Sequence, residues 1–172
     1  RFDTEKGVYV VDCSNYVDQI LQAVSPHAYL SLVDSCGVDT PNTRHYYDFF
    51  SDLNNNQPYW GKIGDVEDLR PGDIIVFRYK KHRHGATAGH MMMVMDRPIK
   101  EANTFSVRVA DSAPVGHSQD TRKSHVSGIG IGTLLLKTNP KTGLLDSYAW
   151  REGALWRHNV SFAMARPLDL DS

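Results

Sequence analysis

Residues 12–17 read Asp-Cys-Ser-Asn-Tyr-Val, and they place a cysteine where an amphipathic helix begins. Apolar residues then recur at spacings of three and four, which predicts a helix with one buried face. These residues are Tyr16, Val17, Ile20, Leu21 and Val24. Asp12 is a suitable N-cap, so Cys13 is expected in the first turn, where unpaired N–H groups and the helix dipole favour a thiolate. This position is typical of a nucleophile. The alternative for an isolated cysteine is a small buried apolar residue.

The composition is that of an ordinary globular protein. Of the 172 residues, 41% are hydrophobic and 23% are charged, and we expect a single domain spanning residues 1–172. The formal net charge of -1 does not indicate a nucleic-acid partner. No segment approaches the roughly 20 apolar residues that cross a bilayer, so we expect no membrane span. The chain begins at Arg1 without a methionine, and we expect that an upstream targeting segment has been removed.

The sequence favours a free cysteine and no metal or cofactor. A bridge between Cys13 and Cys36 is the alternative in an oxidising compartment, but it would consume the candidate nucleophile. We interpret Cys36 as a structural cysteine near a helix end. A metal site built from His82, His84 and either His90 or Cys13 is a further alternative, but this spacing matches no zinc signature well.

Start and stop signals divide the chain into helices followed by strands. Ser25-Pro26 and Gly37 delimit a second helix over residues 26–36, and Thr40-Pro41 predicts the start of a third. Six later runs predict strands, at residues 74–77, 91–95, 105–110, 129–137, 144–150 and 161–165. Turns rather than helices separate these runs, which is typical of an antiparallel sheet. The predicted fold class is therefore α+β, with N-terminal helices packed on an antiparallel sheet of about five or six strands.

A cysteine nucleophile needs a base within hydrogen-bond reach and a third group that orients this base. Among the eight histidines, His90 is distinguished by its position, because it follows Gly89 and opens a predicted strand. The next predicted strand, at residues 105–110, leads directly into Asp111. If the two strands are antiparallel neighbours, we expect Asp111 to accept the imidazole Nδ1–H and leave the other nitrogen facing Cys13. The alternative is that His90 caps a strand and Asp111 opens a turn.

Three motifs in this order resemble the NlpC/P60 superfamily of papain-like cysteine peptidases and amidases, to which the CHAP amidases are related. They are Asp12-Cys13-Ser14 before an amphipathic helix, Leu-Arg-Pro-Gly-Asp-Ile-Ile-Val-Phe at residues 69–77, and Gly89-His90 before an apolar strand. The resemblance covers about residues 8–115. It implies a papain-like fold in which Cys13 is the nucleophile and His90 is the base.

The resemblance also implies roles for further residues. Asp111 occupies the region of the orienting third residue, which is often His, Asn or Gln in the family, and His117 is the alternative. The family often carries a tyrosine shortly before the cysteine that helps to form the site, and Tyr9 is the candidate here. Ser14, from the Asp-Cys-Ser motif, is also expected at the substrate. One oxyanion donor is expected from the backbone N–H of Cys13.

The implied activity is hydrolysis of an amide bond, commonly in bacterial cell-wall peptides, through a thioester on Cys13. The implied partner is a peptide or peptidoglycan-type substrate, and the implied location is secreted, periplasmic or in the cell envelope. One alternative is an acyltransferase or transglutaminase-like enzyme that passes the same thioester to an amine or lipid. The other is a binding module of the same fold without catalysis, although the joint presence of Cys13, His90 and Asp111 argues against it.

Overall fold

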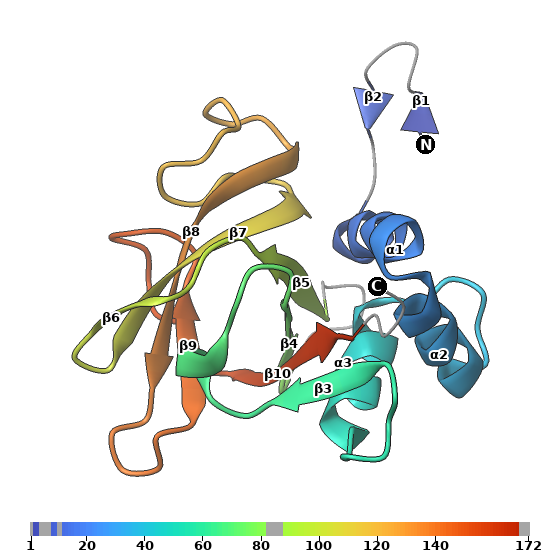
Figure 1. Ribbon diagram of the computed structural model, residues 1–172. Helices are drawn as coiled ribbons and strands as arrows, with labels where there is room; N and C mark the ends of the chain where they lie inside the picture. The colour runs from blue at the N-terminus through green and yellow to red at the C-terminus, as the bar shows by residue number, and fades with distance from the viewer. Residues whose placement is uncertain (1, 4–7, 10–11, 82–87, 169–172) are drawn as a thin grey trace.

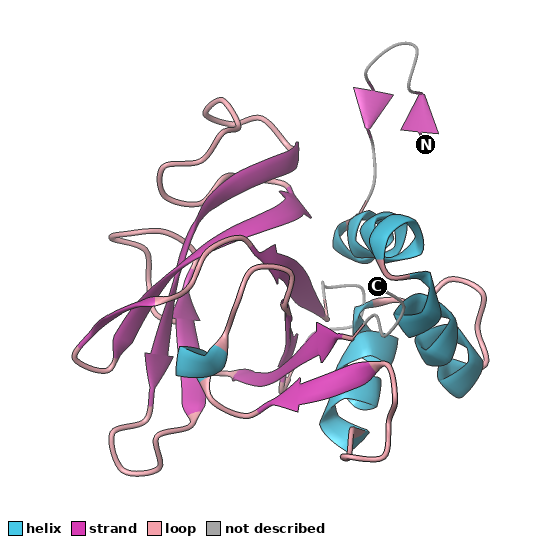
Figure 2. Cartoon of the chain, viewed as in Figure 1, coloured by secondary structure: helices cyan, strands magenta, loops and turns pink. Residues whose placement is uncertain are grey.

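The computed structural model describes residues 2–3, 8–9, 12–81 and 88–168. Within these residues the fold is α+β, as expected, with three α-helices beside an antiparallel sheet of eight strands (Figures 1 and 2). The helices and the short 3-10 helix are α1 (Cys13–Val24), α2 (Pro26–Cys36), α3 (Thr43–Asp52) and η1 (Val66–Asp68). The strands of the large sheet are β3 (Trp60–Ile63), β4 (Ile74–Tyr79), β5 (Gly89–Val94), β6 (Ile99–Glu101), β7 (Thr104–Ala113), β8 (Gly128–Thr138), β9 (Leu145–Ala149) and β10 (Val160–Pro167). A separate pair is formed by β1 (Phe2–Asp3) and β2 (Val8–Tyr9).

Local capping determines where the helices begin and end. The carboxylate of Asp12 accepts the backbone N–H of Asn15 at 2.8 Å, which fixes the start of α1. Gly37 ends α2 in the left-handed region, with a φ of 66° that a glycine adopts without strain. The third helix begins two residues after the expected Thr40-Pro41 signal, because Asn42 forms a capping box with His45.

The strand order of the large sheet is β3-β10-β4-β5-β7-β8-β9, with β6 added to one edge of β7. The sheet curls, so that β9 comes into contact with β10 although the two strands are separated in the order (Figure 1). The described residues contain more strands than the five or six expected, because β3 and β6 are only four and three residues long. Such short runs give no clear period-two pattern in the sequence.

Two apolar cores lie on the two faces of this curled sheet. The three helices cover one face, where Met91 packs with Val17, Leu21 and Phe50. The other face encloses a second core that includes Met92. Neighbouring methionines thus point to opposite faces of β5, as the alternation of a strand requires. Among the described residues, no helix is long and apolar enough to cross a membrane.

A buried carboxylate joins α1 to α3 within the helical layer. Asp18 is 2% exposed, and its Oδ1 accepts the hydroxyl of Tyr46 at 2.5 Å. Its Oδ2 has no hydrogen-bond partner among the described residues. Burial raises the pKa of Asp18 to about 6, although the hydrogen bond from Tyr46 opposes the shift and the charge of Asp12 adds to it. The helical layer therefore contains an acid that is destabilising when it is ionised.

We expect Asp18→Asn to stabilise the protein at neutral pH. The folded-state pKa of about 6 lies above the unfolded value of 3.8, so the folded protein binds the proton more tightly. The contribution of Asp18 to the free energy of unfolding is therefore most favourable below pH 3.8 and falls as the pH rises through 6, by about 2–3 kcal/mol. Urea denaturation between about pH 4 and about pH 8, which bracket the titration of the folded protein, measures this fall, and the variant should lack it.

The matched control is Asp34→Asn, which removes an exposed carboxylate from α2. This variant should keep the pH dependence of the wild type. Equal pH dependence in wild type and Asp18→Asn would contradict the interpretation of Asp18 as a buried, destabilising anion.

Candidate active site

The start of α1 presents Cys13 with free N–H groups around it. Asp12 uses its side chain for the N–H of Asn15 and its carbonyl for the N–H of Tyr16 at 3.1 Å. Within the described residues, the N–H groups of Cys13 and Ser14 make no such bond, as is usual in a first turn. They remain available to bind a developing negative charge beside the sulfur.

The start of β5 positions His90 opposite β4. His90 pairs in register with Phe77, so both side chains project from the same face of the sheet. Gly89 is needed at this point, because a Cβ atom there would lie 2.0 Å from the carbonyl oxygen of Phe77. The close approach of the two strands therefore requires the glycine that precedes the histidine.

The register of β5 and β7 brings His90 and Asp111 together. These two strands pair only at Met93 with Ala110 and at Val94 with Val109. His90 and Asp111 are each an even number of residues from the Val94–Val109 pair, so both point to the same face. Beyond Met93 the strands separate, and the two side chains fill the space between them.

The hydrogen bond between His90 and Asp111 uses Nε2 of the imidazole. Nε2 lies 2.6 Å from Oδ2 of Asp111, and since a carboxylate only accepts, Nε2 is the donor. The sequence-based expectation that Nδ1 would make this bond is therefore wrong. Nε2 of the His90 ring points toward Asp111 on β7, so Nδ1 is the nitrogen left for the contact with Cys13.

Asp111 is fully buried and receives three N–H groups. Besides His90, its Oδ2 accepts Nε2–H of His117 at 2.8 Å, and its Oδ1 accepts Nη2–H of Arg122 at 2.8 Å. Burial alone would raise the pKa of Asp111, but the hydrogen bonds from His117 and His90 and their positive charges lower it well below its usual range. Nδ1 of His117 also lies 2.8 Å from the carbonyl oxygen of Trp150, so both ring nitrogens of His117 have hydrogen-bond partners.

Asp120 anchors this arrangement from the segment between β7 and β8. Its carboxylate accepts Nε–H and Nη2–H of Arg122 at 2.8 Å each, and the backbone N–H of His117 at 2.8 Å. Two glycines of β8 make room for it. A Cβ atom on Gly130 would lie 2.4 Å from Nε of Arg122, and one on Gly132 would lie 2.4 Å from Oδ2 of Asp120. Because Gly130 pairs in register with Asp111, these glycines lie directly beside the buried carboxylate.

The Cys13 thiol is held between His90 and the start of α3. Its Sγ lies 3.5 Å from Oγ1 of Thr43. Burial raises the pKa of Cys13, but the hydrogen bond and positive charge of His90, the hydroxyl of Thr43 and the backbone of Met91 together lower it below the ordinary value. Burial lowers the pKa of His90, but its bonds to Asp111 and Cys13 outweigh this and raise it to about 9. The two shifts therefore favour a thiolate on Cys13 beside an imidazolium on His90.

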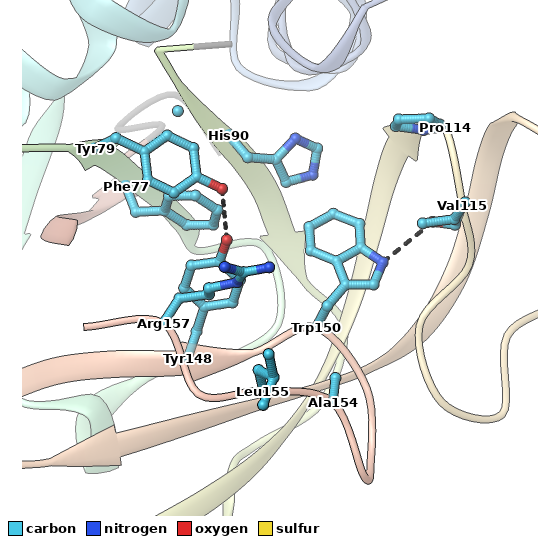
Figure 3. Close-up of a pocket in the computed structure, with 11 residues that line it drawn as sticks. Phe77, Tyr79, His90, Pro114, Val115, Tyr148, Trp150, Ala154, Leu155 and Arg157 are labelled. Carbon is cyan, nitrogen blue, oxygen red and sulfur yellow. Dashed lines mark hydrogen bonds between the residues drawn. The ribbon is translucent and has the colours of Figure 1, made fainter. Parts of the chain in front are cut away.

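Two hollows flank this pair. One has a volume of about 440 Å³ and is lined by Cys13, Ser14, Thr43 and Arg78 among other polar residues. The other has a volume of about 600 Å³, includes His90, and has mainly aromatic and aliphatic walls (Figure 3). Gly89, which directly precedes His90, lines both hollows.

The structure brings four of the predicted site residues into one connected arrangement, namely Cys13, His90, Asp111 and His117. Asp111 is the residue that contacts His90, whereas His117 contacts Asp111 from the other side. Ser14 lines the polar hollow, but its hydroxyl donates to Asp12 at 3.0 Å.

Other sequence-based interpretations have different outcomes. The side chain of Tyr9 and the residues His82 and His84 lie outside the described residues. Within the part that the structure describes, no cluster of His, Cys, Asp or Glu is arranged to hold a metal ion. Cys36 is the last residue of α2 and, like Cys13, is a free thiol.

The contacts that Thr43, Asp120, Arg122 and Trp150 make in this site were not predicted from the sequence. The alternating glycines of Gly-Ile-Gly-Ile-Gly at residues 128–132 were the available signal, because glycine within a strand often marks the close approach of another part of the chain. Thr43 and Trp150 carry no such signal. Their roles depend on which segments of the fold meet.

Comparison of the chain with protein-family models, with curated proteins and with solved structures found no match in any of the three.

We expect iodoacetamide to alkylate Cys13 at pH values well below the ordinary thiol pKa of about 8.5. Cys36 is an internal control, because burial and the charge of Asp48 raise its pKa. Peptide mass spectrometry after timed alkylation separates the two rates. In His90→Ala the rate at Cys13 should fall to that of Cys36, since burial remains while the positive charge is lost. Equal pH dependence of both cysteines in the wild type would exclude the ion pair.

We expect Gly132→Ala to displace Asp120 and His117, which belong to the hydrogen-bond network around Asp111. The added Cβ would lie 2.4 Å from Oδ2 of Asp120 and 2.7 Å from Cβ of His117, so the segment must shift. The free energy of unfolding should fall by about 1–3 kcal/mol, as for other overpacked sites, and the alkylation of Cys13 should move to higher pH. Gly64→Ala is the matched control, because its Cβ would meet nothing within 4 Å. A variant at Gly132 that alkylates like the control would show that the segment does not support the ion pair.

Proposed function

We propose that the protein is a cysteine hydrolase that cleaves an amide or peptide bond through a thioester intermediate. The observation that carries this proposal is the 2.6 Å hydrogen bond from Nε2 of His90 to the buried Asp111, on the side of the ring away from Cys13. A fixed imidazolium beside a thiolate at a helix start is the arrangement that nucleophilic catalysis by cysteine requires.

Acylation begins with the Cys13 thiolate. The sulfur attacks the carbonyl carbon of the scissile amide and forms a C–S bond, while the carbonyl π electrons move to oxygen. The N–H groups of Cys13 and Ser14 at the start of α1 are positioned to stabilise this oxyanion. The neighbouring positive end of the helix dipole acts in the same direction.

His90 then serves as the acid. Its imidazolium donates a proton to the amide nitrogen, the C–N bond breaks, and the amine leaves with the thioester remaining on Cys13. In the second half, neutral His90 removes a proton from water, whose oxygen attacks the thioester. The C–S bond breaks, the carboxylic acid leaves, and the thiolate–imidazolium pair is restored.

The substrate that the resemblance suggests is a peptide of the bacterial cell wall, which accords with a secreted or envelope-associated protein. The polar hollow beside Cys13 and the apolar hollow beside His90 together offer room for groups on both sides of a scissile bond.

We expect purified cell-wall muropeptides to be hydrolysed by the wild type and left intact by Cys13→Ala, which should retain its fold. The rate of acylation should decrease above pH 9 or so, because the pKa of His90 is about 9 and the neutral ring has no proton for the leaving amine. Chromatography with mass spectrometry of the products measures both effects. Cys36→Ala is the matched control and should retain full turnover. Undiminished turnover by Cys13→Ala would reject the mechanism.

The same assay separates the other two functions that share this site. Added amine would be found joined to the acyl product if the thioester is passed to an acceptor instead of water. A catalytically inactive binding module would hold the muropeptide without releasing any amine.

A further inference from the structure

The hollow beside His90 is a rigid aromatic pocket. Its volume is about 600 Å³, and the side chains in Figure 3 converge on it from β4, β5, β9 and the segment after β9. The rings of Phe77 and Tyr148 stack at a centroid distance of 4.4 Å, and the hydroxyls of Tyr79 and Tyr148 lie 2.6 Å apart. Trp150 packs edge-on to His90 at 5.1 Å and donates its indole N–H to the carbonyl of Gly116 at 3.2 Å. The walls are therefore fixed without a ligand.

The rim of this pocket exposes apolar side chains to solvent. Leu155 is 77% exposed and Val115 is 42% exposed, and both line the pocket. Exposed apolar groups around an aromatic cavity favour a ligand that covers them, since burial of apolar surface contributes about 25 cal/mol per Å². The body of the ligand is therefore expected to be apolar.

Arg157 gives the same pocket one positive charge. Its side chain lines the cavity, and its backbone pairs with that of Tyr148 in the aromatic wall, with the N–H of Arg157 donating to the carbonyl of Tyr148 at 2.7 Å. Among the described residues, no carboxylate forms an ion pair with Arg157. An arginine in such a position presents a fork of donors that fits a carboxylate.

The chemistry of the proposed hydrolysis assigns a direction to the substrate. His90 lines the aromatic pocket, and it is the group that protonates the leaving nitrogen. Cys13, which binds the acyl carbon, lines the polar hollow on the other side. The leaving amine must therefore project from the sulfur toward the aromatic pocket.

We propose that the aromatic pocket binds the leaving group, and that its preferred leaving group is an amino acid with a bulky apolar side chain and a free carboxylate held by Arg157. This inference rests on the proposed function for its direction, and it specifies the class of bond that the enzyme cleaves. The preferred substrate is thus an acyl-amino acid or a peptide cut before its last residue.

Three probes with one acyl part separate the two requirements. The first probe, N-acetyl-alanyl-phenylalanine, has the aromatic side chain and the carboxylate. The second, N-acetyl-alanyl-phenylalanine amide, lacks the negative charge, and the third, N-acetyl-alanyl-glycine, lacks the aromatic side chain. We expect kcat/KM for the first probe to exceed that of each other probe by about tenfold or more, the usual effect of one charge-assisted hydrogen bond or one buried aromatic group.

Arg157→Gln should reduce the preference for the free carboxylate over the amide to less than about threefold, as expected when a charge-assisted bond becomes a neutral one. The matched control is Arg151→Gln, which removes an exposed arginine that does not line the pocket. The control should keep the wild-type preference. Retention of the preference in Arg157→Gln, or equal kcat/KM for all three probes, would overturn the assignment.

A binding measurement separates this assignment from the proposed function. We expect 3-phenylpropanoate to change the fluorescence of Trp150 in Cys13→Ala, and to bind at least about tenfold more weakly when Arg157→Gln is added. Binding of this probe without hydrolysis of any substrate would support the pocket and reject the hydrolase. Hydrolysis with no preference and no binding would support the hydrolase and reject the pocket.

Discussion

The buried carboxylate of Asp111 is the group on which the candidate site depends. A fully buried carboxylate loses its hydration, and without compensation it would take up a proton. Three N–H groups from His90, His117 and Arg122 replace that hydration and keep the charge. The ionised Asp111 in turn favours the protonated form of His90, whose charge favours the thiolate of Cys13. Each ionised group is therefore stabilised by its neighbour, and this series of contacts runs from Asp111 through His90 to the sulfur of Cys13.

Acidic and basic side chains alternate in this arrangement. The acidic groups are Cys13, Asp111 and Asp120, and the basic groups that contact them are His90, His117 and Arg122. Alternation matters because the Coulomb attraction between opposite charges in contact offsets part of the hydration that burial removes, whereas an unpaired buried charge has no such compensation. The segment that supplies His117, Asp120 and Arg122 is tied to β8 by paired backbone bonds between Ser118 and Thr133. The network is thus built on the sheet and not on a detached loop.

Much of the scaffold was predictable from local signals, whereas the support of the site was not. The Asp12 cap, the Pro26 and Gly37 boundaries and the period-two strands predicted helices, strands and the α+β class, because each signal acts within a few residues. The nearness of His90 and Asp111 followed from the expected antiparallel pairing of their two strands. The choice of Nε2 did not, since the rotation of a ring depends on what surrounds it in three dimensions. Arg122 and Asp120 escaped prediction for the same reason, because they reach Asp111 only through the fold of the segment after β7.

Trp150 belongs both to the aromatic pocket and to the packing around the Asp111 network. Its ring forms one wall of the aromatic pocket and packs against both His90 and His117, at centroid distances of 5.1 Å and 4.1 Å. Its carbonyl oxygen lies 2.8 Å from Nδ1 of His117. The indole therefore covers the hydrogen bonds to Asp111 and limits the access of water to them. Because hydrogen bonds between ions strengthen as the local dielectric falls, a ligand packed on the open face of Trp150 would strengthen the pairing of His90 with Asp111. The pocket that selects the leaving group and the network that protonates it thus share one side chain, and neither can change without affecting the other.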